Sequence, residues 1–197
     1  MKRTVFLPIV TVALAALVLF GASVGLNGIA NANAQALHLQ QMQTLLPGST
    51  DFTVEAYTGD DANIRSVHKG ETGYVIETST YGYAGQITVL VGVSLKGTVT
   101  GLVITDMAET PGLGFNALKD WEFLAQFLNT SGGVSIGTAG SDAFSSATGS
   151  ASGSTDTYVD GISGATVTSK AIARCVNSAV AYVTGADAGS GATSWGG

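Results

Sequence analysis

A run of small residues that ends in a threonine is the part of this chain best suited to hold a phosphorylated ligand. It reads Asp160-Gly161-Ile162-Ser163-Gly164-Ala165-Thr166 and leads into a helical pattern over residues 168–183. Its two glycines allow a tight turn, and Thr168 or Ser169 is expected to cap the helix. The free N–H groups and the dipole of a helix start attract phosphate. The pattern predicts that the Thr166 hydroxyl lies beside a phosphate-binding surface, and an ordinary capped turn is the alternative.

A second segment has the composition of a loop that lies against a flat ligand. It reads Glu109-Thr110-Pro111-Gly112-Leu113-Gly114 and follows a predicted strand that ends near Thr105. Pro111 fixes one φ angle, and the flanking glycines let the backbone approach a ring closely. The spacing Gly112-x-Gly114-x-x-Ala117 also fits a dinucleotide-binding fingerprint. That alternative is disfavoured because no acidic residue follows about 20 positions later and no strand–helix–strand alternation surrounds the segment.

Together, the two segments resemble those of the FMN-binding subunits of Rnf-type and Na⁺-translocating quinone reductase complexes. The resemblance implies that a separate flavin transferase esterifies the FMN phosphate to Thr166. It also implies that the residues before this threonine are recognition positions, namely Asp160, Ser163, Gly164 and Ala165. The resemblance covers about residues 1–128 and 158–184.

The glycine-rich loop matches the same family's Glu-Thr-Pro-Gly-Leu-Gly signature. The resemblance therefore implies that five residues lie against the flavin ring, namely Glu109, Thr110, Gly112, Leu113 and Gly114. The stretch Tyr81–Gly85 and the strands after it are also similar to the family. No catalytic residue and no metal ligand are expected in the chain itself.

Two further stretches match the small-residue motif formally. Asp187–Thr193 fits it fully, and Asp142–Thr148 nearly does. Neither runs into an amphipathic helix, and chance repeats are expected in a chain with 27 glycines. Thr166 is therefore the predicted attachment residue, and modification of Thr193 is left open.

The elements around these segments predict an α+β fold. β-branched runs separated by turn residues predict an antiparallel meander over residues 73–80, 86–93 and 98–105, with a strand-like stretch at 52–54. Helical spacing predicts helices over 115–128 and 168–183 that pack on the sheet. Residues 130–157 form a low-complexity loop with one possible short strand at 134–136, and residues 185–197 a flexible tail. The FMN-binding domain is expected to span residues 49–184.

The N-terminus predicts a membrane anchor over residues 1–28. Its apolar run of about 22 residues spans about 33 Å as a helix, enough for the hydrocarbon core. A cleaved signal peptide with a small-residue site in residues 30–36 is the alternative. Lys2 and Arg3 place the N-terminus in the cytoplasm and the domain outside the cell (inner) membrane. A juxtamembrane segment, residues 29–48, contains a predicted helix at 37–46 that packs on the domain.

Composition excludes several classes of function. The net charge of −6 and the charged fraction of 11% argue against a nucleic-acid partner. A single cysteine, Cys175, excludes an intramolecular disulfide and lies in an apolar stripe that predicts a buried thiol. His38 and His68 have no metal partners at usable spacing, so no metal site is expected.

The resemblance implies a covalent FMN carrier that relays electrons in an ion-translocating ferredoxin:NAD⁺ oxidoreductase of the Rnf type, as its G-type subunit. Its partners would be the other membrane subunits, with the flavin transferase needed for maturation. Three alternatives stay open: a stand-alone exported flavoprotein, the C-type subunit of a Na⁺-translocating NADH:quinone reductase, and a non-redox surface binding module. The sequence leaves open the pumped ion and the flavin potential.

Overall fold

The computed structural model describes residues 33–109, 112–131, 133–137 and 157–185. The chain divides into two units, Met1–Gln40 and Gln41–Gly197. A helix over residues 33–45 opens the described part and begins four residues before the predicted helix. None of the helices in the described ranges is long and apolar enough to cross a membrane. The predicted anchor, the centre of the low-complexity loop and nearly all of the tail lie outside the described residues.

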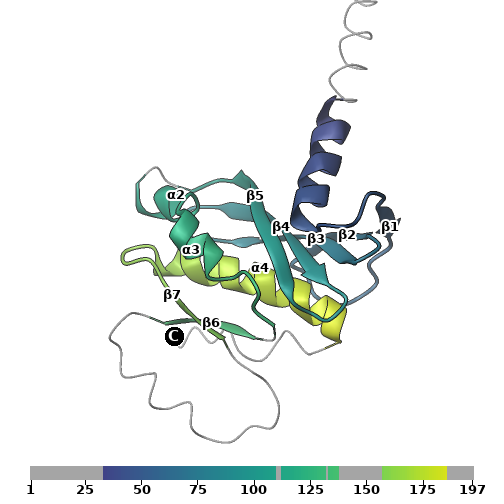
Figure 1. Cartoon of the computed structure of the whole chain (residues 1–197). Helices are drawn as coiled ribbons and strands as arrows, with labels where there is room; N and C mark the ends of the chain where they lie inside the picture. Colours follow the sequence, from purple (N-terminus) through teal and green to yellow (C-terminus); the bar gives the residue numbers. More distant parts are fainter. Residues whose placement is uncertain (1–32, 110–111, 132, 138–156, 186–197) are drawn as a thin grey trace, which may run out of the picture. The chain divides into compact units, whose positions relative to one another are not determined.

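An antiparallel sheet in meander order forms the centre of the second unit (Figure 1). Its strands are β1 (Thr53–Glu55), β2 (Ile64–Lys69), β3 (Gly73–Tyr81), β4 (Gln86–Ser94) and β5 (Val99–Met107). The three predicted long strands are confirmed as β3, β4 and β5, and the strand-like stretch as β1. Strand β2 was not predicted, because Arg65, His68 and Lys69 weaken its apolar alternation.

One face of this sheet is made by alternate β-branched residues of its central strands. On β4 these are Ile87, Val89, Val91 and Val93, all fully buried. Strand residues two apart point to the same face, so these four side chains line one surface. The neighbouring β3 runs antiparallel to β4 from Gly73 opposite Ser94 to Tyr81 opposite Gln86. This unbroken register fixes which residues enter the core.

Helix α4 (Thr166–Thr184) packs across that face (Figure 1). The predicted apolar stripe is confirmed, since Ile172, Cys175, Val176 and Ala179 are fully buried in the core cluster. The helix ends at Gly185, whose φ of 69° is the left-handed conformation that glycine adopts easily. The long helix therefore spans the sheet, and its N-terminus reaches the end at which α2 and α3 lie (Figure 1).

The prediction of one continuous helix over residues 115–128 is wrong. The structure has two short helices instead, α2 (Leu113–Ala117) and α3 (Trp121–Ala125). The break lies at Asp120, whose carboxylate accepts hydrogen bonds from the backbone N–H groups of Glu122 and Phe123. An aspartate in this position starts a new helix rather than continuing one. Phe123 and Phe127 are then buried in edge-to-face contact with ring centroids 5.3 Å apart.

A parallel strand pair, β6 (Val134–Gly137) with β7 (Thr157–Asp160), completes the fold. The predicted strand at 134–136 is confirmed, so the low-complexity loop is not structureless at its start. The parallel pairing was not predicted. Asn177 of α4 secures it, because its side-chain amide accepts from the Val134 N–H at 2.8 Å and donates to the Val134 carbonyl at 2.9 Å.

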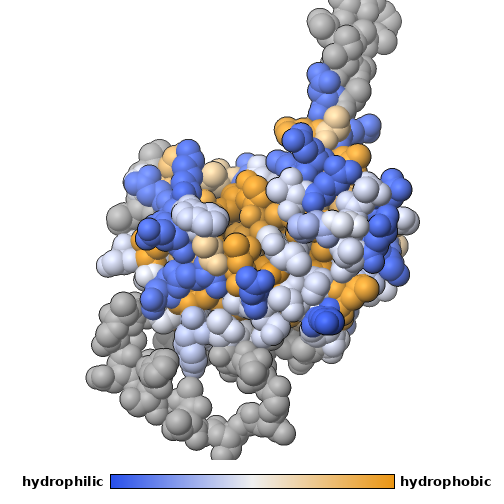
Figure 2. All heavy atoms as spheres, viewed as in Figure 1, coloured by the Kyte–Doolittle hydropathy of each residue, from blue (hydrophilic) through white to orange (hydrophobic). Residues whose placement is uncertain are grey.

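The opposite face of the sheet is covered over part of its area by the end of the first described helix. Met42, Leu45 and Leu46 are buried there with Val75 and Leu90. This confirms that the end of the predicted juxtamembrane helix packs on the domain. Apolar side chains gather in the middle of the surface seen in Figure 2. On the edge strand β5, the half-buried Leu102 and Ile104 pack against the core cluster that includes α4, and Val103 packs against the cluster on the opposite face.

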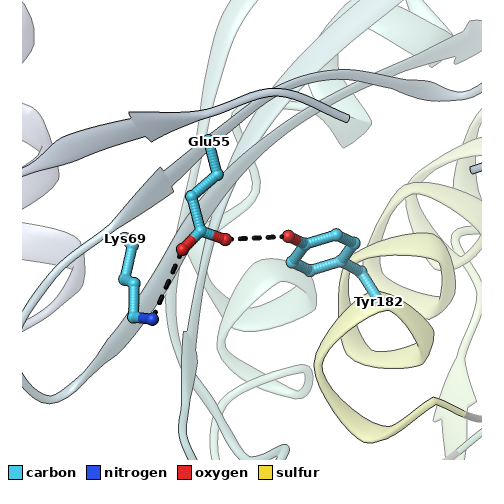
Figure 3. A network of polar contacts seen from close by, with 3 residues as sticks. All are labelled: Glu55, Lys69 and Tyr182. Atoms are coloured by element: carbon cyan, nitrogen blue, oxygen red, sulfur yellow. Dashed lines mark hydrogen bonds and ion pairs between the residues drawn. The ribbon is translucent and has the colours of Figure 1, made fainter. Parts of the chain in front are cut away.

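A polar network joins β1 and β2 to the last turns of α4 (Figure 3). The Glu55 carboxylate pairs with Lys69 Nζ at 3.3 Å and accepts a hydrogen bond from the Tyr182 hydroxyl at 3.1 Å. The pKa of Lys69 is raised, first by its hydrogen bond with Glu55. The pKa of Tyr182 is also raised, first by desolvation and then by the hydrogen bond to Glu55. The network anchors the C-terminal end of α4, away from its N-terminus.

Candidate functional site

The small-residue motif forms a hydrogen-bonded turn that delivers the chain into α4. The Ala165 N–H donates to the Ile162 carbonyl at 2.9 Å, and Gly164 has a φ of 78°. Such a φ is unfavourable for a residue with a Cβ, so glycine is needed at this point of the turn. Ser163 and Gly164 are exposed, and Thr166 is half-buried as the first residue of the helix. The turn thus leaves the motif accessible from outside.

Ser169 holds this turn from the inside, which corrects one prediction. Its hydroxyl donates to the Ala165 carbonyl at 3.0 Å and accepts from the Ile162 N–H at 3.2 Å. Ala165, rather than Thr168 or Ser169, is the N-cap residue, and no side chain caps the helix. Helix α4 begins before the predicted position because the Ser169 N–H already donates a helical hydrogen bond to the Ala165 carbonyl. The first N–H groups of α4 therefore have no side-chain cap and can serve an anion.

The residues before the turn are fixed through their backbone. The Asp160 N–H donates to Gln126 Oε1 at 2.8 Å, and the Gly161 N–H donates to the Gly137 carbonyl at 2.8 Å. A Cβ at Gly161 would lie 2.6 Å from the Ile136 side chain, so a larger residue would push the strand pair apart. The Asp160 residue itself is exposed. Its side chain is therefore accessible from solvent.

The second motif begins with a buried glutamate. Glu109 is only 8% exposed, and its carboxylate accepts hydrogen bonds from the N–H groups of Tyr83 at 2.7 Å and Ala84 at 3.3 Å. Thr110 and Pro111 lie outside the described residues. Gly112 follows with a φ of 123° and open space where a Cβ would stand, and α2 then begins at Leu113. The backbone at Gly112 is thus bare and approachable, as predicted for a loop that meets a flat ligand.

Gly114 is where the two motifs meet. A Cβ placed on it would lie 2.8 Å from Glu109 Oε2 and 3.0 Å from Thr168 Oγ1. Two segments more than 50 residues apart in the sequence are therefore in contact, as a shared ligand site requires. This contact also explains the glycine, because a side chain here would separate the loop from the start of α4.

Two buried polar atoms next to these motifs have no protein partner within the described ranges. One is the hydroxyl of Thr168, a residue 1% exposed, and the other is Nε of Arg174. Buried polar groups are rarely left unpaired, so such atoms are expected at a ligand site. The sequence predicts only a capping role for Thr168 and no role for Arg174. The sequence pattern carried no signal for Arg174, because this residue lies two positions after Ile172 and therefore off the apolar stripe of the helix.

These observations fit a phosphorylated flavin. The uncapped start of α4 suits a phosphate, the bare backbone at Gly112 suits a ring, and the unpaired Thr168 hydroxyl supplies a further polar partner. The structure brings Glu109, Gly112 and Gly114 to the end of the sheet where Thr166 begins α4. It does not expose the Glu109 carboxylate, which the backbone of the β3–β4 turn already occupies.

Other candidate chemistry does not assemble within the part of the chain that the structure describes. No group of three or more histidine, cysteine, aspartate or glutamate residues could hold a metal ion there. Burial raises the pKa of the Cys175 thiol from 9.0 to about 11. A thiol with this pKa has little thiolate at neutral pH and is unreactive. This agrees with the prediction of an inert buried cysteine.

Comparisons with known proteins agree with the geometry. Residues 82–181 match the family model described as an FMN-binding domain. The G subunit of an ion-translocating oxidoreductase complex from Methanosarcina acetivorans is 33% identical over 73% of each chain. The G subunit of a Na⁺-translocating ferredoxin:NAD⁺ oxidoreductase complex from Acetobacterium woodii is 35% identical over 55% of this chain and 47% of its own length. The chain thus spans only about half of this second relative.

A solved structure with a similar chain path is the C subunit of a Na⁺-translocating NADH-quinone reductase from Parabacteroides distasonis. It is 22% identical and has a TM-score of 0.46 over 64% of this chain and 63% of its own. The family match covers half of the chain and includes both the β3–β4 turn and the start of α4. The chain therefore belongs to the FMN-binding domain family.

Proposed function

We propose that this protein carries FMN as a phosphoester on Thr166 and relays electrons within an Rnf-type, ion-translocating ferredoxin:NAD⁺ oxidoreductase complex. Membership of the FMN-binding domain family and relatives named as G subunits of such complexes support the proposal. The observation that carries it is the position of Thr166. This residue opens a helix that no side chain caps, directly after an exposed glycine turn.

The chain's own contribution is attachment and orientation. In the coupling step, Thr166 Oγ forms a bond to the flavin-side phosphorus of a flavin dinucleotide, whose two phosphates form a pyrophosphate linkage and which the flavin transferase holds. The bond to the nucleotide leaving group breaks, and the hydroxyl proton is lost with that group. The N–H groups at the start of α4 then face the phosphate. The bound flavin supplies the one- and two-electron chemistry.

The site residues have separate roles in this proposal. Ser163 and Gly164 form the exposed part of the turn that the transferase recognises, the buried Ala165 leads from it into α4, and Asp160 is a further exposed recognition position. Gly112 and Gly114 bring bare backbone toward the ring, and Thr110 and Leu113 belong to the same loop. Covalent attachment keeps the cofactor on a domain that faces away from the cytoplasm. We propose that residues 1–28 anchor this domain to the other membrane subunits of the complex.

The proposal is tested by producing the full chain with and without a flavin transferase. With the transferase, a denaturing gel should show a fluorescent band, and the intact mass should rise by one FMN less one water. Thr166→Ala should abolish both signals, and Thr166→Ser should retain at least part of them because a hydroxyl remains. Thr105→Ala changes an exposed threonine on β5 and should behave like the unchanged chain. A colourless unchanged chain in a host that flavinylates another substrate would overturn the proposal.

A further inference from the structure

The β3–β4 turn is tied to the flavin loop by one carboxylate. Two successive N–H groups, those of Tyr83 and Ala84, donate to the two oxygens of Glu109. The turn closes on itself through the Gly82 N–H and the Gly85 carbonyl at 2.8 Å. Successive N–H groups that converge on one anion form a small binding concavity. Here a side chain of the protein fills that concavity.

The glycines of the turn are explained by the same contact. A Cβ at Gly82 would overlap Glu109 Oε1, and a Cβ at Gly85 would lie 2.5 Å from the Ala108 carbonyl oxygen. The turn therefore rests directly on the first residues of the flavin loop. Glycine is required at both positions because the approach is that close.

The start of the turn is held by α4. Arg174 Nη2 donates to the Tyr81 carbonyl at 3.5 Å, while Nε of the same side chain is buried without a partner among the described residues. The turn is thus fastened at Tyr81 by the helix that carries the attachment residue, and at Tyr83 and Ala84 by the loop that faces the ring. Both fastenings come from elements of the proposed flavin site.

Two aromatic side chains stand out from this turn. Tyr81 is 72% exposed and Tyr83 is 77% exposed. Two large aromatic rings that are exposed on one short turn form an apolar surface. Such a surface commonly meets a ligand or a partner. The fastened turn holds the backbone of Tyr83 against Glu109, the first residue of the flavin loop, and carries both exposed rings.

We propose that Glu109 and Arg174 are positioning residues that hold the Tyr81–Gly85 turn as a wall of the flavin site, where its tyrosine rings shield the flavin from solvent. This inference rests on the proposed function. It assigns Glu109 a role through the turn rather than through direct contact with the ring, because its carboxylate is already engaged by backbone N–H groups.

The first test needs no flavin. The unchanged chain and its variants are produced without the transferase and kept in detergent. Hydrogen exchange of the peptides that cover the turn is then measured by mass spectrometry and compared between them. Glu109→Ala should speed exchange at Tyr83 and Ala84 by about tenfold or more, since both N–H groups lose a charged acceptor. Glu109→Gln keeps one acceptor oxygen and should give an intermediate rate. Glu122→Ala, an exposed glutamate on α3, should change nothing. Unchanged turn exchange in Glu109→Ala would overturn the fastening.

The second test uses the flavinylated chain and measures quenching of flavin fluorescence by iodide. Glu109→Ala and Arg174→Met should keep one FMN per chain by intact mass, but iodide should quench them about twofold more strongly because the turn opens locally. Glu109→Gln should lie between Glu109→Ala and the unchanged chain. Equal quenching in all variants that carry flavin would overturn the shielding role and leave the proposed function intact. Absence of flavin from the unchanged chain would instead overturn the proposed function.

Discussion

The Glu109 carboxylate accepts a hydrogen bond from the backbone N–H of Tyr83 at 2.7 Å, across 26 residues of sequence. This bond joins the β3–β4 turn to the glycine-rich loop, and Gly114 then brings that loop against Thr168 on α4. Three segments that are separate in the sequence thus form one surface. The start of α4, with Thr166 as its first residue, belongs to this surface.

Gly114→Ala tests the contact between the two motifs. The added methyl group would press on Glu109 Oε2 and Thr168 Oγ1, and overpacking of this kind typically destabilises by about 1–3 kcal/mol. The free energy of unfolding, measured by urea denaturation in detergent, should fall by that amount. Gly137→Ala is the matched control, because a Cβ there has open space within 4 Å, and should change stability by less than about 0.5 kcal/mol. Equal stabilities of the two variants would contradict the contact.

Asn177→Ala tests how the parallel strand pair is held. The change leaves the N–H and carbonyl of Val134 without their side-chain partner, and Val134 is buried. Leaving a buried polar group unsatisfied costs about 1–3 kcal/mol. The same denaturation experiment should show this loss, and exchange of the β6 amides should quicken. Asn116→Ala, on the exposed side of α2, is expected to have no comparable effect. A neutral Asn177→Ala would show that β6 and β7 are held by other contacts.

The buried thiol predicts an alkaline loss of stability. The pKa of Cys175 is about 11 in the folded chain against 9.0 when exposed, so above pH 9 the unfolded state binds fewer protons than the folded state. The free energy of unfolding must then fall between about pH 9 and pH 11, by up to about 2 kcal/mol from this group. The pKa of Tyr182 is raised from 10.0 and that of Lys69 from 10.5, so these groups act in the same direction from about those pH values upward.

Cys175→Ala isolates this contribution. Its stability should be lower at neutral pH because a buried atom is removed, but the slope between pH 9 and pH 10 should become shallower, so that the two stabilities converge at alkaline pH. At pH 8 the folded chain should resist a thiol reagent that labels the urea-unfolded chain fully. Rapid labelling of the folded chain would contradict the burial of the thiol.

The central strands and α4 could be predicted because each carries its own pattern. Residues such as Val89 and Val91 alternate along β4, and Ile172, Cys175 and Val176 recur at helical spacing. Short turns then leave an antiparallel meander as the simplest arrangement. The residue types within each strand or helix were therefore enough to predict that element.

The remaining features depend on contacts between distant residues. The β6–β7 pair is held in part by Asn177 of a third element, which bonds to both backbone groups of Val134. The break before α3 depends on Asp120, whose capping role is visible only once the chain turns there. In the site, the attachment motif and the bare glycine loop were predicted from their sequences. The burial of Glu109 was not, since a glutamate in a loop is ordinarily expected to face solvent.

The most direct measurement of the central claim is peptide mapping of the full chain after production with the flavin transferase. Cleavage after Lys119, Lys170 and Arg174 separates the peptide that carries Thr148 and Thr166 from the peptide that carries Thr193. The account predicts one FMN phosphoester in the peptide that ends at Lys170, with fragmentation placing it on Thr166. Flavin on the peptide that contains Thr193, or on Thr148, would contradict the account.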